Sequence, residues 1–188
     1  MKQLTLTLSF GLITSFGFSQ DYSVNFLKGT RDFEENISTF DPSSIASGER
    51  WQDNYYRYLQ FNAIPTTDEL EEIKSLGIEL IEYIPNYTYL ASIPSHLNSA
   101  QLEQINVRSI QAIEYTYKVS ERIQDKNYPV WSMNGERLKL IISLYEDVDM
   151  VSAMNQLKKE GASIELTVDH VNDLILASMP QRQMPSRN

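Results

Sequence analysis

The sequence predicts an α+β fold that contains two copies of one strand-helix-strand-strand unit. Segments that begin near Tyr56 and Leu138 alternate along the chain with the period of a β-strand. Each is followed by a stretch of helical periodicity that ends at an isolated glycine, Gly77 or Gly161. The letters LASIP (90–94) and LASMP (176–180) then close the two copies. Five similar letters can arise by chance, but the shared order of elements favours duplication.

The first copy reads as a complete β-α-β-β-α-β unit. The first helix is indicated by Thr66 or Thr67 as a cap, followed by an apolar face of Leu70, Ile73 and Leu76. The second, shorter helix is indicated by Leu102 and Ile105. The expected elements are a strand at 56–61, a helix ending at Gly77, strands at 78–84 and 87–93, a helix at 99–106 and a strand at 110–117. This order is that of the ferredoxin-like unit, an antiparallel sheet with both helices on one face.

The second copy contains only the first four of these elements. The expected elements are a strand at 138–145, a helix at 148–160 and strands at 163–166 and 173–179. Without a last strand, the outer edge of 138–145 would expose unpaired backbone groups. We therefore expect tandem ferredoxin-like units, the second incomplete at its C-terminus. Either the chain is a truncated piece of a longer protein, or a partner supplies the strand.

The N-terminus has the pattern of a secretory signal peptide. Lys2 precedes an apolar run at 4–18, and the small-x-small pattern of Gly17 and Ser19 suggests cleavage before Gln20. The run is too short for a membrane span. We expect an exported protein, periplasmic, cell-surface or secreted. The expected organisation is a signal peptide (1–19), an N-terminal extension (20–54) with a linker at 42–48, a first ferredoxin-like unit (55–120), a linker (121–136) and a second, truncated unit (137–188).

Composition excludes several classes of function. The net charge of −9 disfavours binding to nucleic acid and to anionic lipid, so we expect neither nucleic acid nor membrane as a partner after signal cleavage. The chain has no cysteine, which excludes disulfides, thiolate metal sites and a cysteine nucleophile.

Several segments of the first copy resemble a known family. They are 55–62, 64–65, 76–86 and, most specifically, IEYIPNYTYLASIP at 81–94. Together they are similar to the N-terminal region of large secreted subtilisin-like (S8) serine peptidases of Gram-negative bacteria, and the resemblance covers most of 22–180. It implies pro-peptide-like units that precede a catalytic domain and dock on it through an open sheet face. The implied partner is a subtilisin-like peptidase domain, in cis or in trans.

The sequence lacks the catalytic residues of that family. Its histidines are His96 and His170. Asp169 adjoins His170, but neighbours on a strand point to opposite faces, so the pair cannot form a carboxylate-imidazole contact. We expect no catalytic residue and no cofactor in this chain.

An acidic cluster precedes the helix of the second copy. Glu146, Asp147 and Asp149 would suit a hard cation, but acidic residues in the first turn of a helix also interact with its positive end. We favour the second interpretation, because the loop lacks the alternating oxygen ligands and turn glycine of a calcium loop. No metal site is therefore expected.

Partner binding is the function that the residues favour. The sheet face away from the helices is expected to contain four residues that could bind a partner, because tyrosine suits an interface. They are Tyr56, Tyr58 and Gln60, with Tyr83 from the adjoining hairpin. The alternative is that these side chains only cover their own sheet. The leading hypothesis is a non-catalytic pro-region of the chaperone or inhibitor type. A stand-alone exported protein-binding or peptidase-inhibitor module is the alternative, and a small-ligand sensor rests on fold analogy alone.

Overall fold

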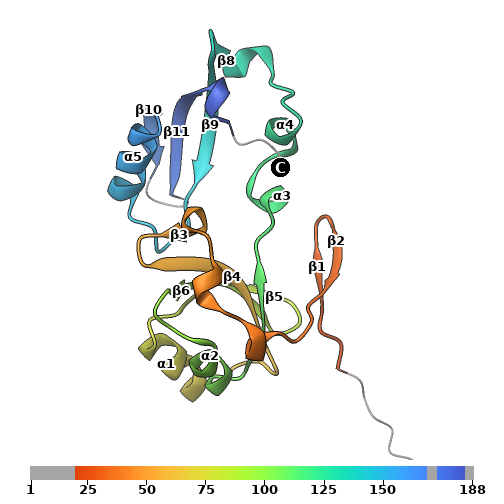
Figure 1. Cartoon of the computed structure of the whole chain (residues 1–188). Coiled ribbons are helices and arrows are strands. Elements are labelled where there is room, and N and C mark those ends of the chain that lie inside the picture. The colour runs from red at the N-terminus through yellow and green to blue at the C-terminus, as the bar shows by residue number, and fades with distance from the viewer. Residues whose placement is uncertain (1–19, 169–172, 185–188) are drawn as a thin grey trace, which may run out of the picture.

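The computed structural model describes residues 20–168 and 173–184 and is a mixed α+β protein with several antiparallel sheets. Two larger sheets follow one another along the long axis of the molecule (Figure 1). The expected signal peptide, Asp169 and His170 lie outside the described residues. Within the residues that are described, no helix has the length and apolar character needed to cross a membrane.

The first sheet has the order β3-β4-β6-β5, and β7 also pairs with β4. Its strands are β3 (Arg50–Trp51), β4 (Asn54–Phe61), β5 (Glu79–Ile84), β6 (Thr88–Pro94) and β7 (Val107–Ala112). Helices α1 (Thr67–Ser75) and α2 (Ser99–Gln104) lie together on one face (Figure 1). Thr66 is the N-cap of α1, as one of the two predicted alternatives stated. The core between helices and sheet includes Leu59, Phe61, Ile73, Leu102, Ile105 and Ile110.

The last strand of this sheet differs from the prediction. β7 ends at Ala112, and Tyr115–Lys118 form the one-turn helix α3 instead of continuing the strand to 117. The aromatic residues there favoured a strand by propensity. Tertiary packing overrides that preference, because the Tyr117 ring lies 5.1 Å from the Phe26 ring of the N-terminal segment.

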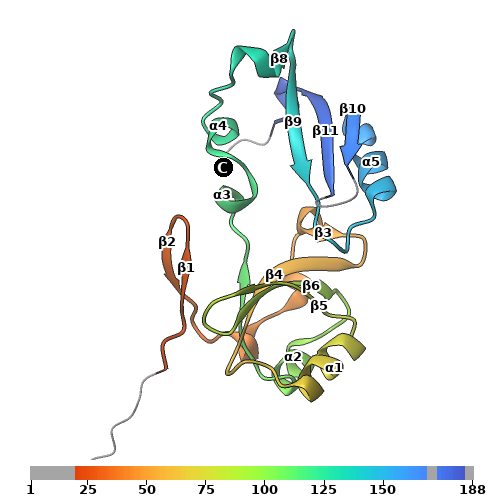
Figure 2. The ribbon, with the colours of Figure 1, turned by 180° about the vertical axis from the view of Figure 1, so that it is seen from behind.

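The N-terminal segment packs on the first sheet. It contains a hairpin of β1 (Ser23–Phe26) and β2 (Gly29–Asp32) and three short 3-10 helices, η1 (Ile37–Thr39), η2 (Pro42–Ser44) and η3 (Ser47–Glu49). The hairpin lies beside α3 (Figure 2), where Lys28 donates to the carbonyl of Thr116 at 3.0 Å.

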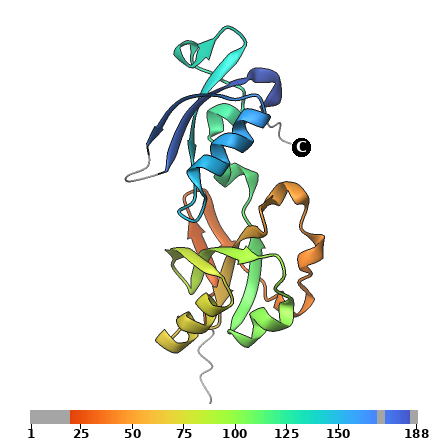
Figure 3. The same cartoon turned by 90° about the vertical axis from the view of Figure 1, so that its left-hand side faces the viewer.

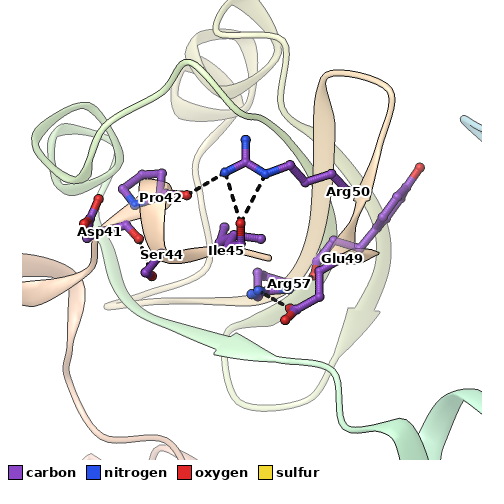
Figure 4. A network of polar contacts seen from close by, with 8 residues as sticks. Asp41, Pro42, Ser44, Ile45, Glu49, Arg50 and Arg57 are labelled. Carbon is purple, nitrogen blue, oxygen red and sulfur yellow. Dashed lines mark hydrogen bonds and ion pairs between the residues drawn. The ribbon is translucent and has the colours of Figure 1, made fainter. Parts of the chain in front are cut away.

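The prediction of a linker at 42–48 is wrong. Ile45 is buried in the first core, and the Arg50 guanidinium donates to the carbonyls of Pro42 at 3.0 Å and Ile45 at 3.3 Å (Figure 4). Beside it, Glu49 accepts from the buried Arg57 at 2.5 Å. The composition of 42–48 gave no sign that an arginine of the following strand would bind the carbonyls of this loop.

The second sheet has the order β10-β11-β9-β8. Its strands are β8 (Met133–Asn134), β9 (Arg137–Ser143), β10 (Ser163–Val168) and β11 (Leu174–Pro180). Helix α5 (Met150–Lys159) lies across one face (Figure 3). The segment between the sheets, expected as a plain linker, contains α4 (Glu121–Gln124), η4 (Val130–Ser132) and β8; η5 (Gln181–Gln183) follows β11.

One of the residues predicted for the buried face of α5 is exposed in the structure. Val151 is 58% exposed, whereas Ala153 is buried against the sheet. The helix begins at Met150, because Asp149 is its N-cap and accepts from the Ser152 amide at 2.7 Å. The small Ala153 side chain lets the helix approach the sheet, which the spacing of large apolar residues did not reveal.

The two sheets share a register, and we call residues 47–112 the first repeat and 130–180 the second. TYLASIP forms β6 and LILASMP forms β11. Leu90 pairs with Tyr58 on β4, and Leu176 pairs with Ile141 on β9. The register shifts in the same place, between residues 80 and 82 in β5 and between 164 and 166 in β10. The similarity begins one hairpin earlier than predicted, because β3 pairs with the start of β4 as β8 pairs with the start of β9.

Candidate protein-binding surface

Three of the four predicted partner-binding residues share one face of β4 but are not accessible. Tyr56 and Tyr58 are each 7% exposed, and Gln60 is fully buried. The N-terminal hairpin covers Tyr58, whose ring lies 5.1 Å from that of Phe26 and 6.1 Å from that of Phe33. The expectation that this face is open is therefore wrong, because other segments of the chain pack on it.

Gln60 closes this face through a polar network. Its Nε2 donates to the carbonyls of Tyr22 at 2.8 Å and Asn86 at 3.1 Å. Its Oε1 accepts from Arg108 at 2.8 Å, and the Arg108 guanidinium lies 3.9 Å from the centre of the Tyr22 ring. A buried amide needs such partners, because an unpaired one is costly. The Gln60 side chain therefore holds the N-terminal segment, through Tyr22, against the first sheet.

Tyr56 contacts the second repeat. Its hydroxyl donates to both carboxylate oxygens of Asp147 at 2.9 Å, and its ring lies 4.6 Å from that of Tyr145. Burial, followed by the bond to Asp147, raises the pKa of Tyr56. Burial likewise raises the pKa of Tyr58 to about 12. Both rings remain neutral at physiological pH and contribute packing rather than charge.

Tyr83 lies on the opposite face from the other three. It pairs with Tyr89 across the β5–β6 ladder, their rings 5.1 Å apart, on the side where Tyr89 meets Phe61 of the first core. The register shift between residues 80 and 82 moves Tyr83 to that face. The alternation of side chains along the sequence does not reveal such a bulge, so the face predicted for Tyr83 was wrong.

The acidic cluster before α5 is used within the protein. Asp149 caps the helix, and its hydrogen bonds to Ser152 lower the pKa of this carboxyl. Asp147 accepts from Tyr56. Within residues 20–168 and 173–184 no group of three or more potential metal ligands occurs. His96 is exposed in the loop between β6 and α2.

The exposed sheet face belongs to the second repeat instead. We call the face of the second sheet away from α5 the open face; its apolar residues are Ile141, Leu166, Val168, Leu174 and Leu176. Ile141 is 75%, Leu166 58% and Val168 42% exposed. At one end, Lys139 and Glu165 form an ion pair at 3.4 Å. Contiguous exposed apolar side chains of this kind are typical of a binding surface.

The signal for this face was present in the sequence. Alternation along β9 already separates Lys139, Ile141 and Ser143 from the inward Leu140 and Ile142, and the structure confirms that separation. Tyrosine suits interfaces, which favoured Tyr56 and Tyr58 over Ile141. No pattern in the sequence indicates that the N-terminal segment packs on these tyrosines.

A cavity of about 230 Å³ lies where the end of β9 and helix α5 meet β3 and β4 of the first repeat. Its lining is mainly apolar and comes from both repeats: Trp51, Tyr56, Ile142, Ser143, Leu144, Tyr145, Val148, Ala153, Gln156 and Leu157. In the first repeat, Leu102 of α2, Ile105 and Ile110 of β7 belong to the core around Leu59.

Comparison with known proteins gives one match. A family model described as a domain of unknown function (DUF8729) matches residues 25–114, from β1 to just beyond β7. No curated protein and no solved structure matches the chain. The matched range includes the N-terminal hairpin together with the first sheet, in agreement with their packing into one core.

Proposed function

We propose that the chain is a non-catalytic pro-region of an exported subtilisin-like serine peptidase that acts by docking its second sheet on the peptidase domain. The observation that carries this proposal is the open face, where Ile141, Leu166 and Val168 remain exposed although the first sheet is covered on both sides. A stable fold does not need such a face, since burial of these side chains would add stability. Their exposure is explained by a partner.

The arrangement of elements supports the same proposal. The order β7-β4-β6-β5, with α1 and α2 on one face, corresponds to a ferredoxin-like unit. The second repeat has the equivalent of its first four elements, β9, α5, β10 and β11. Tandem ferredoxin-like units of the pro-peptide type are therefore part of the proposal, as are export and a peptidase domain as the partner. Docking would block the substrate cleft and assist folding of the peptidase.

The test is to add the chain, without residues 1–19, to a purified subtilisin-like peptidase of a Gram-negative bacterium. We expect inhibition of peptide hydrolysis at micromolar concentration and faster recovery of activity after dilution from denaturant. If the chain neither inhibits nor accelerates refolding, the proposal is wrong. Inhibition without accelerated refolding identifies an inhibitor rather than a folding assistant.

Two matched variants locate the docking surface. Leu166→Arg places a charge on the open face and should raise the inhibitory concentration at least about tenfold. Ile64→Arg changes a side chain that is equally exposed, 58% in both cases, but lies in the loop between β4 and α1. This control should inhibit as the unmodified chain does. Equal loss in both variants would contradict docking through the open face.

A further inference from the structure

We propose that the outer edge of β9, the edge away from β11, is a binding site for an extended strand supplied by the partner polypeptide. The strand runs antiparallel to β9 in the place that β7 holds beside β4, and it inserts an aliphatic side chain into the cavity between β9 and α5. This inference rests on the proposed docking function and adds a second contact with the partner, at the strand edge that borders the open face.

The first repeat shows which strands pair with the equivalent edge of β4. The start of β4 pairs with β3 at Tyr55, and the rest pairs with β7 from Arg57 to Phe61. In the second repeat, β8 pairs with Arg137 and Leu138 in the same manner. Among the described residues no strand continues beyond β8 along this edge. The site that β7 fills in the first repeat therefore lacks its strand in the second.

The backbone groups at this edge point outward. The Leu144 amide donates to the Asp173 carbonyl at 2.8 Å, as the Phe61 amide donates to the Tyr87 carbonyl at 2.9 Å in the first repeat. Residues of an antiparallel strand alternate between its two neighbours, so Ile142 also faces β11, while Ile141 and Ser143 face outward. They correspond to Tyr58 and Gln60, which pair with β7.

The cavity adds a side-chain site to the backbone site. In the first repeat Ile110 of β7 lies opposite Leu59, and both are at most 3% exposed. Leu59 corresponds to Ile142, which lines the cavity with Leu144 and Leu157 and is only partly buried. An aliphatic residue opposite Ile142 would complete this core, as Ile110 does beside Leu59. The incoming strand thus gains both hydrogen bonds and buried apolar area.

A second copy of this chain does not meet these requirements. Its β7 is already paired along β4. Pairing of two β9 edges would not fill the cavities either. The inward side chains of each β9 pack on the α5 of the same copy, so neither copy has a side chain to place in the cavity of the other. The net charge of −9 favours a segment that is neutral or basic. The occupant is therefore an extended, non-acidic segment of the partner domain, with an aliphatic residue at its centre.

The experiment uses a synthetic peptide of residues 106–113, this chain's own β7 sequence, and amide hydrogen exchange of the chain without residues 1–19 followed by NMR. In the free protein the amides of Ile141 and Ser143 should exchange at least about a hundredfold faster than those of Leu140 and Ile142. The peptide, at concentrations up to about 1 mM, should slow exchange at Ile141 and Ser143 selectively. Protection of these two amides without peptide, or no change with it, would overturn the proposal.

Variants separate the backbone site from general loss of structure. Ile141→Pro removes an outward N–H but no bond to β11, so the fold should persist and peptide affinity should fall at least about tenfold. Val151→Ala, at an exposed position of α5 that does not line the cavity, is the control and should bind as the unmodified chain does. If Ile141→Pro does not fold, Ser143→Pro tests the other outward amide. A peptide in which Ile110 is replaced by Asp should fail to bind, since the cavity is apolar. No peptidase is present, so a negative result leaves the proposed function to its own test.

Discussion

Three tyrosines of β4 show how burial changes the chemistry of a side chain. Tyr55 lies in the first core with a hydroxyl that has no hydrogen-bond partner among the described residues, while Tyr56 and Tyr58 lie on the other face. Burial is the largest cause that raises the pKa of Tyr55 and of Tyr58 to about 12. A phenolate is far harder to bury than a phenol, so these rings oppose ionisation in the folded protein.

This shift predicts a loss of stability at alkaline pH. The unfolded tyrosines ionise near pH 10 and the folded ones near 12, so the stabilisation is complete below pH 10 and is lost as pH rises through 12. Each such tyrosine should lower the free energy of unfolding by about 1.4 kcal/mol per pH unit within that window. Urea unfolding at several pH values measures the slope.

Tyr58→Phe tests the assignment of that slope. The variant should lose stability less steeply between pH 10 and 12, because one ionising ring is gone, and its curve should run parallel to that of the unmodified chain below pH 9. Tyr55→Phe should give a similar reduction from the other face of the strand. An unchanged slope in both variants would show that other groups cause the alkaline transition.

At the scale of elements, the two longer helices end in the same way. Gly77 follows α1 with φ of +79° and Gly161 follows α5 with φ of +82°. In both cases the glycine amide donates to a lysine carbonyl three residues back, Lys74 at 2.9 Å and Lys158 at 3.0 Å. A left-handed residue here satisfies the last carbonyls of the helix and turns the chain toward the next strand. This geometry is why glycine occurs at the same place in both repeats.

Gly77→Ala should therefore be destabilising by about 1 to 2 kcal/mol. Besides the unfavourable φ, the new Cβ would lie 3.2 Å from Cγ of Pro94, the last residue of β6. Gly48→Ala is the matched control, because nothing lies within 4 Å of the added Cβ and its φ is outside the left-handed region. Chemical denaturation of both variants measures the difference, and equal effects would show that the helix end does not require glycine.

At the scale of the whole molecule, the repeats are joined through the hairpin of β3 and β4. Trp51 packs against the cluster around Tyr58 and also against the cluster around Ile175 in the second repeat. The Tyr56 bond to Asp147 lies beside it. Because one indole contacts both cores, we expect the repeats to unfold together rather than as independent domains.

Trp51→Ala should lower the free energy of unfolding by about 2 to 3 kcal/mol and separate the transition into two. Trp131→Ala is the control within the same chain, since Trp131 is 77% exposed and should change stability little. Far-UV circular dichroism follows the unfolding of both variants. A single transition in Trp51→Ala, with stability close to that of the control, would exclude this role.

The elements of both repeats could be predicted from the sequence because they depend on local patterns. Alternation identified β4 and β9, and the shared letters at Pro94 and Pro180 identified β6 and β11. The boundaries were less accurate, as at β7. Its end depends on Tyr117, whose contact with Phe26 joins residues far apart along the chain.

The exposed sheet face lies on a different sheet from the one that the sequence predicted. An open sheet face was expected at Tyr56, Tyr58 and Gln60, and it occurs at Ile141, Leu166 and Val168. The difference arises from the N-terminal hairpin, which covers the first sheet through contacts of Phe26 and Phe33. Segment 20–46 has no counterpart in the second repeat that could have indicated where it packs.

The strand and helix periods and the two glycine helix ends could be read from the sequence, since each depends on the conformation of neighbouring residues. Tertiary packing was needed to establish which sheet face stays exposed, where the register shift places Tyr83, and which edge of β9 lacks a strand among the described residues. Exposure depends on which distant segment packs on a surface, and pairing depends on which strand arrives beside it. Neither is encoded in the spacing of adjacent side chains.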